Sequence, residues 1–343
     1  MAKKKIDHAE TNIKSDKKAE KKLYEHAPSL LNLKPEDIAV EVSHLTKDYG
    51  KGRGVFDISF VVPKGKTFGY CGTNGAGKTT TLRHIMGFLK PQSGYAKVKG
   101  INAWENPEEI KKFVGYLPGE IAFPPLENGS EFLKLQATML GLNDMSRAEE
   151  IINALQLDPT ANLKRMSKGM KQKTALVAAF MHSPEIVLLD EPTTGLDPLM
   201  RESFINIIKQ EKERGTTIIM SNHMFDELEE CCDYVAFIKD GKIIDIVDMA
   251  ELHNLPYRVY EVSFVDKKGY DMVDTSQIEV IETRPEDFWY LVKVPIEKTD
   301  GMFRELAKFR IKLIKEVQYS LEKYFIENVV GGIEYESESN INK

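Results

Sequence analysis

The sequence predicts an α/β fold, in which a core of parallel strands and helices is followed by a small α+β domain. A glycine-rich loop at residues 72–80 lies between a short buried strand, residues 67–71, and a helix. Residues 186–191 form a continuous apolar run that ends in two acids, as expected for the central strand of a parallel sheet. A further short strand, residues 216–220, ends at the same edge.

The composition sets bounds on the class of protein. At 343 residues the chain is longer than one ordinary domain, so a core domain with an appendage is expected. The apolar fraction of 42% is enough for a sizeable core. The formal net charge of −6 argues against a protein that binds nucleic acid through bulk charge, and no nucleic-acid partner is expected.

The cysteines and the hydropathy pattern indicate the compartment. Cys71, Cys231 and Cys232 are too few and too badly spaced for a disulfide framework, and they do not follow a zinc pattern. Three buried thiols in a reducing compartment are expected. No run approaches 18 uncharged apolar residues, and no apolar segment follows the basic N-terminus to make a signal peptide. We therefore expect a cytoplasmic protein.

Composition shifts divide the chain into three parts. Residues 1–34 are rich in lysine and poor in apolar side chains, which predicts a disordered, solvated extension rather than a lipid-binding segment. Residues 35–247 form the core domain. Residues 248–343 form an accessory α+β domain with the order strand, strand, helix, strand, helix, and no catalytic constellation is seen in it.

The glycine-rich loop matches the phosphate-binding pattern G-x-x-x-x-G-K-[ST] at every fixed position. Its glycines let successive N–H groups turn inward at a helix N-terminus, where the helix dipole favours an anion such as a triphosphate. Lys78 would reach the β- and γ-phosphates, and the Thr79 hydroxyl would coordinate Mg²⁺. The predicted loop is Gly72-Thr73-Asn74-Gly75-Ala76-Gly77-Lys78-Thr79-Thr80.

Two carboxylates follow the apolar run that begins at residue 186. At the carboxyl end of a central parallel strand, beside a phosphate loop, Asp190 would bind or orient Mg²⁺ and Glu191 would polarise a water molecule. The next strand brings Ser221, Asn222 and His223 to the same edge.

The segments around the loop are less specific. Residues 38–42 and 56–62 alternate as two antiparallel strands, and Tyr49 between them is either a stacking partner for a base or an ordinary loop tyrosine. Residues 127–165 read as an inserted helical lobe. Ser167 and Gly169 then open a helix, either as a second anion-binding terminus or as a plain cap.

These motifs, in this order, resemble the nucleotide-binding domain of ATP-binding cassette (ABC) transporters, a P-loop NTPase fold, over about residues 37–247. The glycine-rich loop is similar to the family's Walker A loop, and residues 186–191 to Walker B. Residues 167–171 resemble the LSGGQ signature, residues 195–197 the D-loop, and His223 the switch histidine. Tyr49 falls where the family has its adenine-stacking aromatic.

The resemblance implies a family fold with a parallel-sheet core, an antiparallel β subdomain and the helical lobe. It implies a head-to-tail homodimer in which ATP on one Walker loop is capped by Ser167 and Gly169 of the second cassette, with Asp197 in the D-loop. Glu191 would be the general base, and His223 would contact the γ-phosphate. ATP and Mg²⁺ are the implied cofactors. The partner implied is a separate transmembrane permease for export, which would hold the subunit at the inner face of the membrane.

Two alternative functions remain open, and the sequence departs from the family's motifs at two positions. A soluble ABC ATPase acting on ribosomes or DNA is the first alternative, and a P-loop kinase or GTPase is the second. Lys168 replaces the first of the two adjacent glycines of the signature. Gly119 stands where the family's glutamine, a Mg²⁺ ligand, is expected, and Glu120 follows it.

Overall fold

The computed structural model describes residues 24–275, 278–317 and 319–326, and the chain divides into two compact units. Unit 1 runs to Met249, and unit 2 begins at Ala250. The sequence predicts this division between residues 247 and 248. Unit 1 contains two sheets and unit 2 contains one, and each unit has its own buried cluster of apolar side chains.

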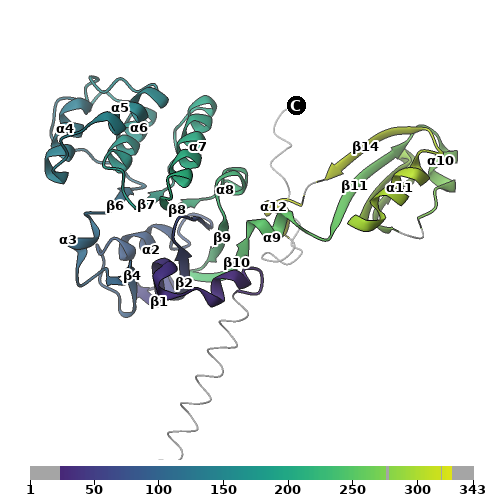
Figure 1. Cartoon of the computed structure of the whole chain (residues 1–343), viewed down its shortest axis with the longest axis horizontal. Coiled ribbons are helices and arrows are strands. Elements are labelled where there is room, and N and C mark those ends of the chain that lie inside the picture. Colours follow the sequence, from purple (N-terminus) through teal and green to yellow (C-terminus); the bar gives the residue numbers. More distant parts are fainter. Residues whose placement is uncertain (1–23, 276–277, 318, 327–343) are drawn as a thin grey trace, which may run out of the picture. The chain divides into compact units, whose positions relative to one another are not determined.

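The centre of unit 1 is a six-stranded sheet in the order β10-β9-β3-β8-β7-β6 (Figure 1). Neighbours from β9 to β6 pair in parallel, and β10 joins the edge antiparallel to β9. All residues of β3 and β7 are buried, which explains the continuous apolar run of β7 before Asp190. The strands are β3 (Thr67–Cys71), β6 (Val114–Leu117), β7 (Ile186–Asp190), β8 (Thr217–Asn222), β9 (Tyr234–Lys239) and β10 (Lys242–Asp248).

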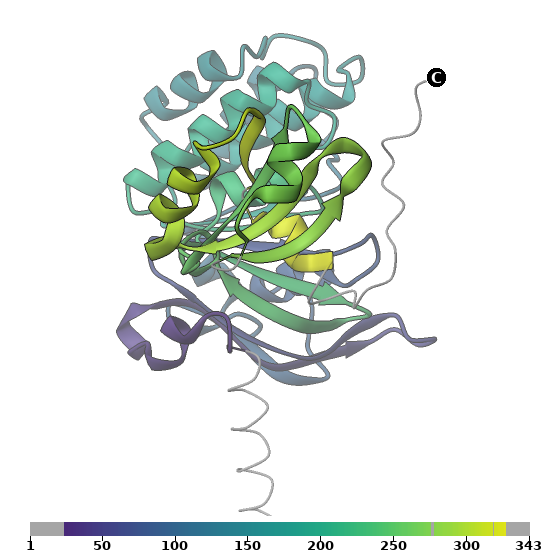
Figure 2. The ribbon, with the colours of Figure 1, turned by 90° about the vertical axis from the view of Figure 1, so that its right-hand side faces the viewer.

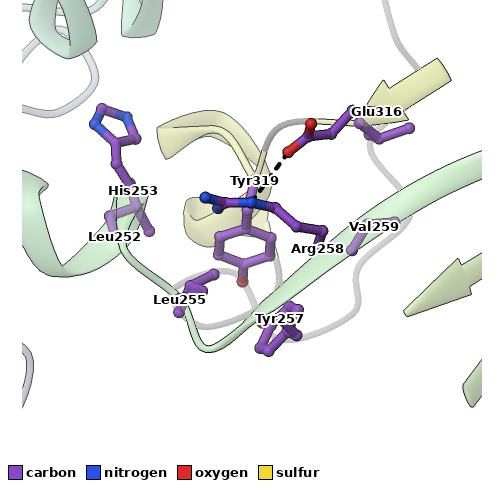
Figure 3. Close-up of a pocket in the computed structure, with 9 residues that line it drawn as sticks. Leu252, His253, Leu255, Tyr257, Arg258, Val259, Glu316 and Tyr319 are labelled. Atoms are coloured by element: carbon purple, nitrogen blue, oxygen red, sulfur yellow. Dashed lines mark ion pairs between the residues drawn. The ribbon is translucent and has the colours of Figure 1, made fainter. Parts of the chain in front are cut away.

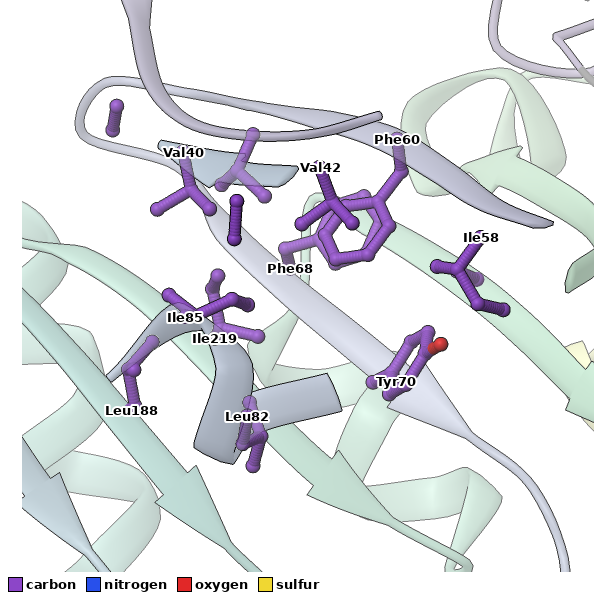
Figure 4. Close-up of a cluster of buried hydrophobic side chains, with 14 of the residues drawn as sticks. Val40, Val42, Ile58, Phe60, Phe68, Tyr70, Leu82, Ile85, Leu188 and Ile219 are labelled. Atoms are coloured by element: carbon purple, nitrogen blue, oxygen red, sulfur yellow. The ribbon is translucent and has the colours of Figure 1, made fainter. Parts of the chain in front are cut away.

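A second, antiparallel sheet in the order β2-β1-β4-β5 confirms the predicted antiparallel subdomain. Its inner face packs on β3 and on helix α2 (Lys78–Ile85), with the ring of Phe60 stacked on Phe68 at 5.1 Å between centroids. Figure 4 shows Leu82 and Ile85 of α2 in the same cluster, which fixes the helix behind the phosphate loop. The strands are β1 (Ile38–Asp48), β2 (Gly54–Pro63), β4 (Ser93–Val98) and β5 (Ile101–Asn102).

The predicted helical lobe is present between β6 and β7. In both views it lies at the opposite end of unit 1 from the antiparallel sheet (Figures 1 and 2). Asn128 caps α4 by accepting from the Glu131 N–H at 3.0 Å, and Gly141 in the left-handed region ends that helix. The helices of unit 1 besides α2 are α3 (Pro107–Ile110), α4 (Gly129–Leu140), α5 (Ser146–Ala154), α6 (Lys168–Phe180), α7 (Pro198–Glu213), α8 (Phe225–Cys231) and α9 (Met249–His253), the last of which crosses the boundary with unit 2.

The predicted disordered extension is wrong for residues 24–34. This segment contains the 3₁₀ turn Pro28–Asn32, and it buries Tyr24, Ala27 and Leu30 in the core of unit 1. Ser29 donates to Asp248 Oδ2 at 3.1 Å. The prediction failed because the three apolar residues lie in and just before a short turn, where they make no helical or strand period. Residues 1–23 lie outside the described part of the chain.

Unit 2 is an α+β domain around an antiparallel sheet in the order β12-β13-β11-β14. The order of elements, βαββαβ, together with this strand order is the split βαβ or ferredoxin-like topology. The sequence misses α10 and β12, since α10 is short and β12 is a mostly exposed edge strand without apolar alternation. The elements are β11 (Tyr257–Phe264), α10 (Lys267–Met272), β12 (Glu279–Arg284), β13 (Trp289–Pro295), α11 (Thr299–Leu306), β14 (Ile311–Val317) and α12 (Leu321–Tyr324).

The cysteines and the helices of the structure relate to the expected compartment. Cys71, Cys231 and Cys232 are free and buried, as predicted. Burial raises the pKa of the Cys71 thiol to about 12, although the nearby Lys78 opposes the shift. Among the helices that the structure describes, none has both the length and the apolar character needed to cross a bilayer.

The packing of the N-terminal segment can be tested with two adjacent leucines. Leu30 is buried and Leu31 is 39% exposed, although both lie in the same 3₁₀ turn. We expect Leu30→Ala to cost about 2–5 kcal/mol of unfolding free energy, because it leaves a cavity in the core. Leu31→Ala should stay within about 0.5 kcal/mol of the parent. Urea unfolding would measure both, and equal midpoints for the two variants would show that the segment does not pack as described.

Candidate functional site

The phosphate loop, the end of β7 and the β1–β2 turn enclose a cleft of about 570 Å³ at the carboxyl edge of the main sheet. Ligands bind at this edge in open α/β sheets, because the loops that follow parallel strands meet there. The residues that line it are Tyr49, Arg53, Gly54, Asn74, Gly75, Gly77, Lys78, Thr79, Thr80, Arg83, Gly119, Glu120, Asp190 and Glu191.

The glycines of the loop are required by its conformation and by its neighbours. Gly75 and Gly77 have φ values of +84° and +112°, which residues with a side chain rarely adopt. A Cβ on Gly77 would lie 2.7 Å from Val55 Cγ1, and one on Gly72 would lie 2.4 Å from the Ile238 carbonyl oxygen. The loop therefore runs directly into α2 at Lys78. The N–H groups of the first turn, which have no helical acceptor, are available to an anion.

Lys78 is held in place before any ligand arrives. Its side chain is only 5% exposed, and Nζ donates to the carbonyl oxygens of Gly72 at 2.7 Å and Thr73 at 3.2 Å. Nζ also lies 3.5 Å from Glu191 Oε1. The ammonium group is thus fixed between the loop and the carboxylate at the end of β7, in a position to meet a phosphate in the cleft.

Asp190 has one oxygen engaged and one oxygen open. Ser221 Oγ donates to Oδ1 at 2.6 Å, whereas Oδ2 is buried and has no hydrogen-bond partner among the described residues. A buried carboxylate oxygen without a partner is costly, and a divalent cation is a ligand that would satisfy it. The site therefore fits Mg²⁺. The pKa of Tyr116 is raised, first by burial and then by the negative charge of Asp190.

Gly119 lies directly against this carboxylate. A Cβ on Gly119 would be 3.0 Å from Asp190 Oδ2, so any side chain here would force its neighbour to shift. Glu120 lines the cleft but is exposed. In this chain the place expected for the family's glutamine is thus filled by backbone.

Glu191 occupies a strained turn. Its φ of +50° lies in the left-handed region, which is unfavourable for a residue with a side chain. Its N–H is shared between Ser221 Oγ at 3.1 Å and the Ser221 carbonyl at 3.2 Å. The turn aims the half-buried carboxylate into the cleft beside Lys78, where it can accept a proton from water.

Tyr49 and His223 differ in their placement. Tyr49 lines the cleft with 48% of its surface exposed, and its turn is closed by its N–H to the Arg53 carbonyl at 2.9 Å. The exposed His223 is not among the residues that line the cleft. It follows Asn222, whose Oδ1 accepts from the His223 N–H at 2.7 Å and whose Nδ2 donates to Glu227 at 2.5 Å.

Ser167, Gly169 and Asp197 do not line the cleft of their own chain. Ser167 Oγ accepts from the Met170 N–H at 3.2 Å and caps α6. Asp197 Oδ1 accepts from the Met200 N–H at 3.0 Å and caps α7. A Cβ on Gly169 would lie 2.8 Å from the Gly195 carbonyl oxygen, so the two segments approach closely.

Several residues of the site are missed by sequence reasoning. Arg53 and Arg83 line the cleft, but single arginines in a turn and on a helix carry no motif. Gln172, which joins α6 to the turn that holds Glu191, is missed as well. Ser221 is predicted at this edge, but its hydrogen bonds to Asp190 and Glu191 are not.

Unit 2 contains a smaller pocket of about 300 Å³ between α9 and the sheet. Figure 3 shows Tyr257 and Tyr319 at this pocket and the ion pair between Arg258 and Glu316, whose Nε and Oε1 are 3.3 Å apart. None of the residues singled out by the sequence lies here. The candidate site of the chain is the cleft of unit 1.

Comparison with known proteins agrees with this geometry. The sequence profile of the ABC transporter family matches residues 55–194, from β2 to the turn after Glu191. The bacitracin transport ATP-binding protein BcrA of Bacillus licheniformis is 30% identical over 303 residues, which is 85% of this chain and 98% of that protein. The chain belongs to the ATP-binding subunits of the ABC transporter family.

Other members of the ABC family resemble the chain over shorter stretches. The linearmycin resistance ATP-binding protein LnrL of Bacillus subtilis is 35% identical over 218 residues, covering 62% of this chain and 70% of that protein. A solved ATP-binding subunit of an ABC transporter matches with a TM-score of 0.58 at 29% identity, over 63% of this chain and 92% of that one. ABC subunits of this kind bind ATP and are ATPases. These relatives give no support to the ribosome or DNA alternative.

Lys78 should be indispensable for nucleotide binding. The N–H groups of the loop cannot by themselves balance the charge of a triphosphate, so Lys78→Ala should abolish ATP binding. Isothermal calorimetry would measure the affinity, with Lys112→Ala, an exposed lysine outside the cleft, as the control. ATP binding at parental affinity by Lys78→Ala would contradict the assignment of the loop.

Proposed function

We propose that the chain is the Mg²⁺-dependent ATP-hydrolysing subunit of an exporter and drives transport through a separate transmembrane protein. The observation that carries the proposal is the single cleft that gathers the phosphate loop, Asp190 and Glu191. The names of BcrA and LnrL, which refer to bacitracin transport and linearmycin resistance, favour export. We assign ATP hydrolysis to residues 35–247 and an accessory role to residues 248–343.

ATP binding follows from the loop and its flanking side chains. Residues 72–80 would hold the phosphates through backbone N–H groups, and the ammonium of Lys78 would turn from its carbonyl partners toward the β- and γ-phosphates. Tyr49, at the rim, would stack on the adenine ring. Thr79 and the open oxygen of Asp190 would hold Mg²⁺, which when bound neutralises charge on the phosphates.

Hydrolysis requires a base beside the γ-phosphate. Glu191 is the carboxylate that faces Lys78, so it would orient a water molecule and take its proton during attack. Lys78 would favour the developing negative charge on the phosphoryl oxygens. Since Gly119 leaves no side chain at the glutamine position, Mg²⁺ would rely on Thr79, Asp190 and water rather than on Glu120.

A second copy would complete the site. Ser167, Gly169 and Asp197 are grouped on one part of the chain but do not line its own cleft. In a head-to-tail dimer, Ser167 and Gly169 of the second cassette would cap the ATP held by residues 72–80. His223, exposed at the end of β8, would contact the γ-phosphate.

The segment after β6 offers a contact for the membrane protein. Phe123 packs on the helical lobe, with its ring centroid 4.7 Å from that of Phe132 and the two ring planes at 65°. The neighbouring Pro124 and Pro125 are exposed. The same segment begins at Gly119, against Asp190. A permease helix packed on these prolines would therefore act on the metal site through a short stretch of backbone. The subunit would then lie peripherally at the inner face of the membrane.

The general base is tested by Glu191→Gln, which keeps the size of the side chain but cannot take a proton. We expect turnover to fall by about 10²–10⁴-fold while ATP binding survives. The variant should accumulate on gel filtration as a dimer that holds ATP. Turnover near that of the parent would mean that another group is the base, and a variant that binds ATP but remains monomeric would count against the shared site.

The membrane partner is tested by capture from detergent-solubilised membranes of the native cells. We expect a protein with membrane-spanning segments to copurify with the tagged parent and to be lost with Pro124→Asp, because the new charge would have to be desolvated at the contact. Met272→Asp, at an exposed position in unit 2, is the matched control. Sedimentation of the chain with ribosomes, without any membrane protein, would overturn the proposal.

A further inference from the structure

The turn that presents Glu191 must be held from two sides. A left-handed backbone at a residue with a side chain persists only where the surroundings determine it. On the amide side, Ser221 accepts the Glu191 N–H through both its hydroxyl and its carbonyl oxygen. On the carbonyl side, the side chain that reaches the turn is that of Gln172.

Gln172 is buried and makes a specific contact. Its side chain is 2% exposed, and Nε2 donates to the carbonyl oxygens of Pro192 at 2.8 Å and Glu191 at 3.3 Å. Both partners can only accept, so the amide nitrogen rather than the amide oxygen must face them. Without this donor, the Pro192 carbonyl at a strained turn would lose the side-chain partner described here, and the Glu191 carbonyl would keep only the Thr194 N–H at 3.2 Å. The turn could then relax toward an ordinary conformation.

Gln172 also belongs to the helix that begins at the signature serine. It lies in the second turn of α6, which Ser167 caps. The first turn of α6 is packed on the segment that follows the turn, since Gly169 has no room for a Cβ beside the Gly195 carbonyl. The turn of Glu191 and the start of α6 are therefore held together by the Gln172 hydrogen bonds and by the packing of Gly169 on Gly195.

We propose that Gln172 is a positioning residue for hydrolysis: it holds the turn of residues 191–192 so that the Glu191 carboxylate points into the cleft. It also links that carboxylate to the end of α6 that begins at Ser167. In the proposed dimer, ATP bound by the second cassette would contact Ser167, and this contact would affect the position of the Glu191 carboxylate through Gln172. This inference rests on the proposed role of Glu191. It concerns the geometry of the base and not the affinity for ATP, because Gln172 does not line the cleft.

The test uses the full-length chain and the variant Gln172→Met, which keeps a side chain of similar length but removes the donor. We expect kcat for ATP hydrolysis to fall by about 10–100-fold, as a displaced catalytic group does, with KM for ATP within about twofold of the parent. Lys173→Met, the neighbouring and partly exposed position on the same helix, should leave both constants unchanged. Gln172→Glu matches the size of glutamine but presents carboxylate oxygens to two carbonyl oxygens, so its kcat should fall at least as far. This variant replaces Gln172→Met in the test if Gln172→Met does not fold.

A double-mutant cycle separates positioning from general damage. In a Glu191→Gln background the base is already absent, so Gln172→Met should cause no further loss in the residual rate. A further loss of similar size, or a rise in KM in the single variant, would show a structural role only and would overturn the inference. Parental kcat in a folded Gln172→Met or Gln172→Glu would also overturn it. Failure of the proposed base is a different result, namely parental turnover of Glu191→Gln itself.

Discussion

The hydrogen bond from the Ser221 hydroxyl to Asp190 is the interaction on which the site depends. It joins the ends of two neighbouring parallel strands, β7 and β8, at the last registered pair of their ladder. Because one carboxylate oxygen is engaged, the other is directed at the space against Gly119. The same hydroxyl accepts the N–H of Glu191, so one buried serine orients both the Asp190 carboxylate, which we propose holds Mg²⁺, and the turn of Glu191, the proposed base.

The charged groups of the cleft already have partners within the chain, so a bound nucleotide would replace existing contacts. Lys78 is buried, and its ammonium is satisfied by loop carbonyls and by Glu191. A buried cation without such partners would be costly. Under the proposed function, a bound triphosphate would replace these acceptors with phosphate oxygens, and Glu191 would then face water. The loop is therefore already organised around the position of the anion.

The helical lobe is tied to the rest of unit 1 by an ionic network with one buried pair, Arg147 and Glu211. Arg147 on α5 pairs with Glu211 of α7, which also accepts from the Thr216 hydroxyl at 2.8 Å. Arg214 bridges Glu211 and Glu150, so both helices contribute a cation and an acid. A buried pair of this kind is costly to break, because it leaves a charge without a partner. The network thus holds α5 to α7, while Gln172 holds α6 to the turn that follows β7.

The sequence by itself determined the loop, the two carboxylates and the order of the motifs, because each depends on local pattern. Glycines at residues 72, 75 and 77 are dictated by backbone geometry, and a fully buried strand such as β7 has an unbroken apolar run. The split βαβ topology of unit 2 and the packing of residues 24–34 could not be predicted from the sequence. Edge strands and short turns have no regular spacing of apolar residues. Only the tertiary structure decided that Ser221 and Gln172 meet the turn of Glu191. Those contacts join residues 19 to 31 positions apart through strand pairing and helix packing, and no local pattern encodes such a distance.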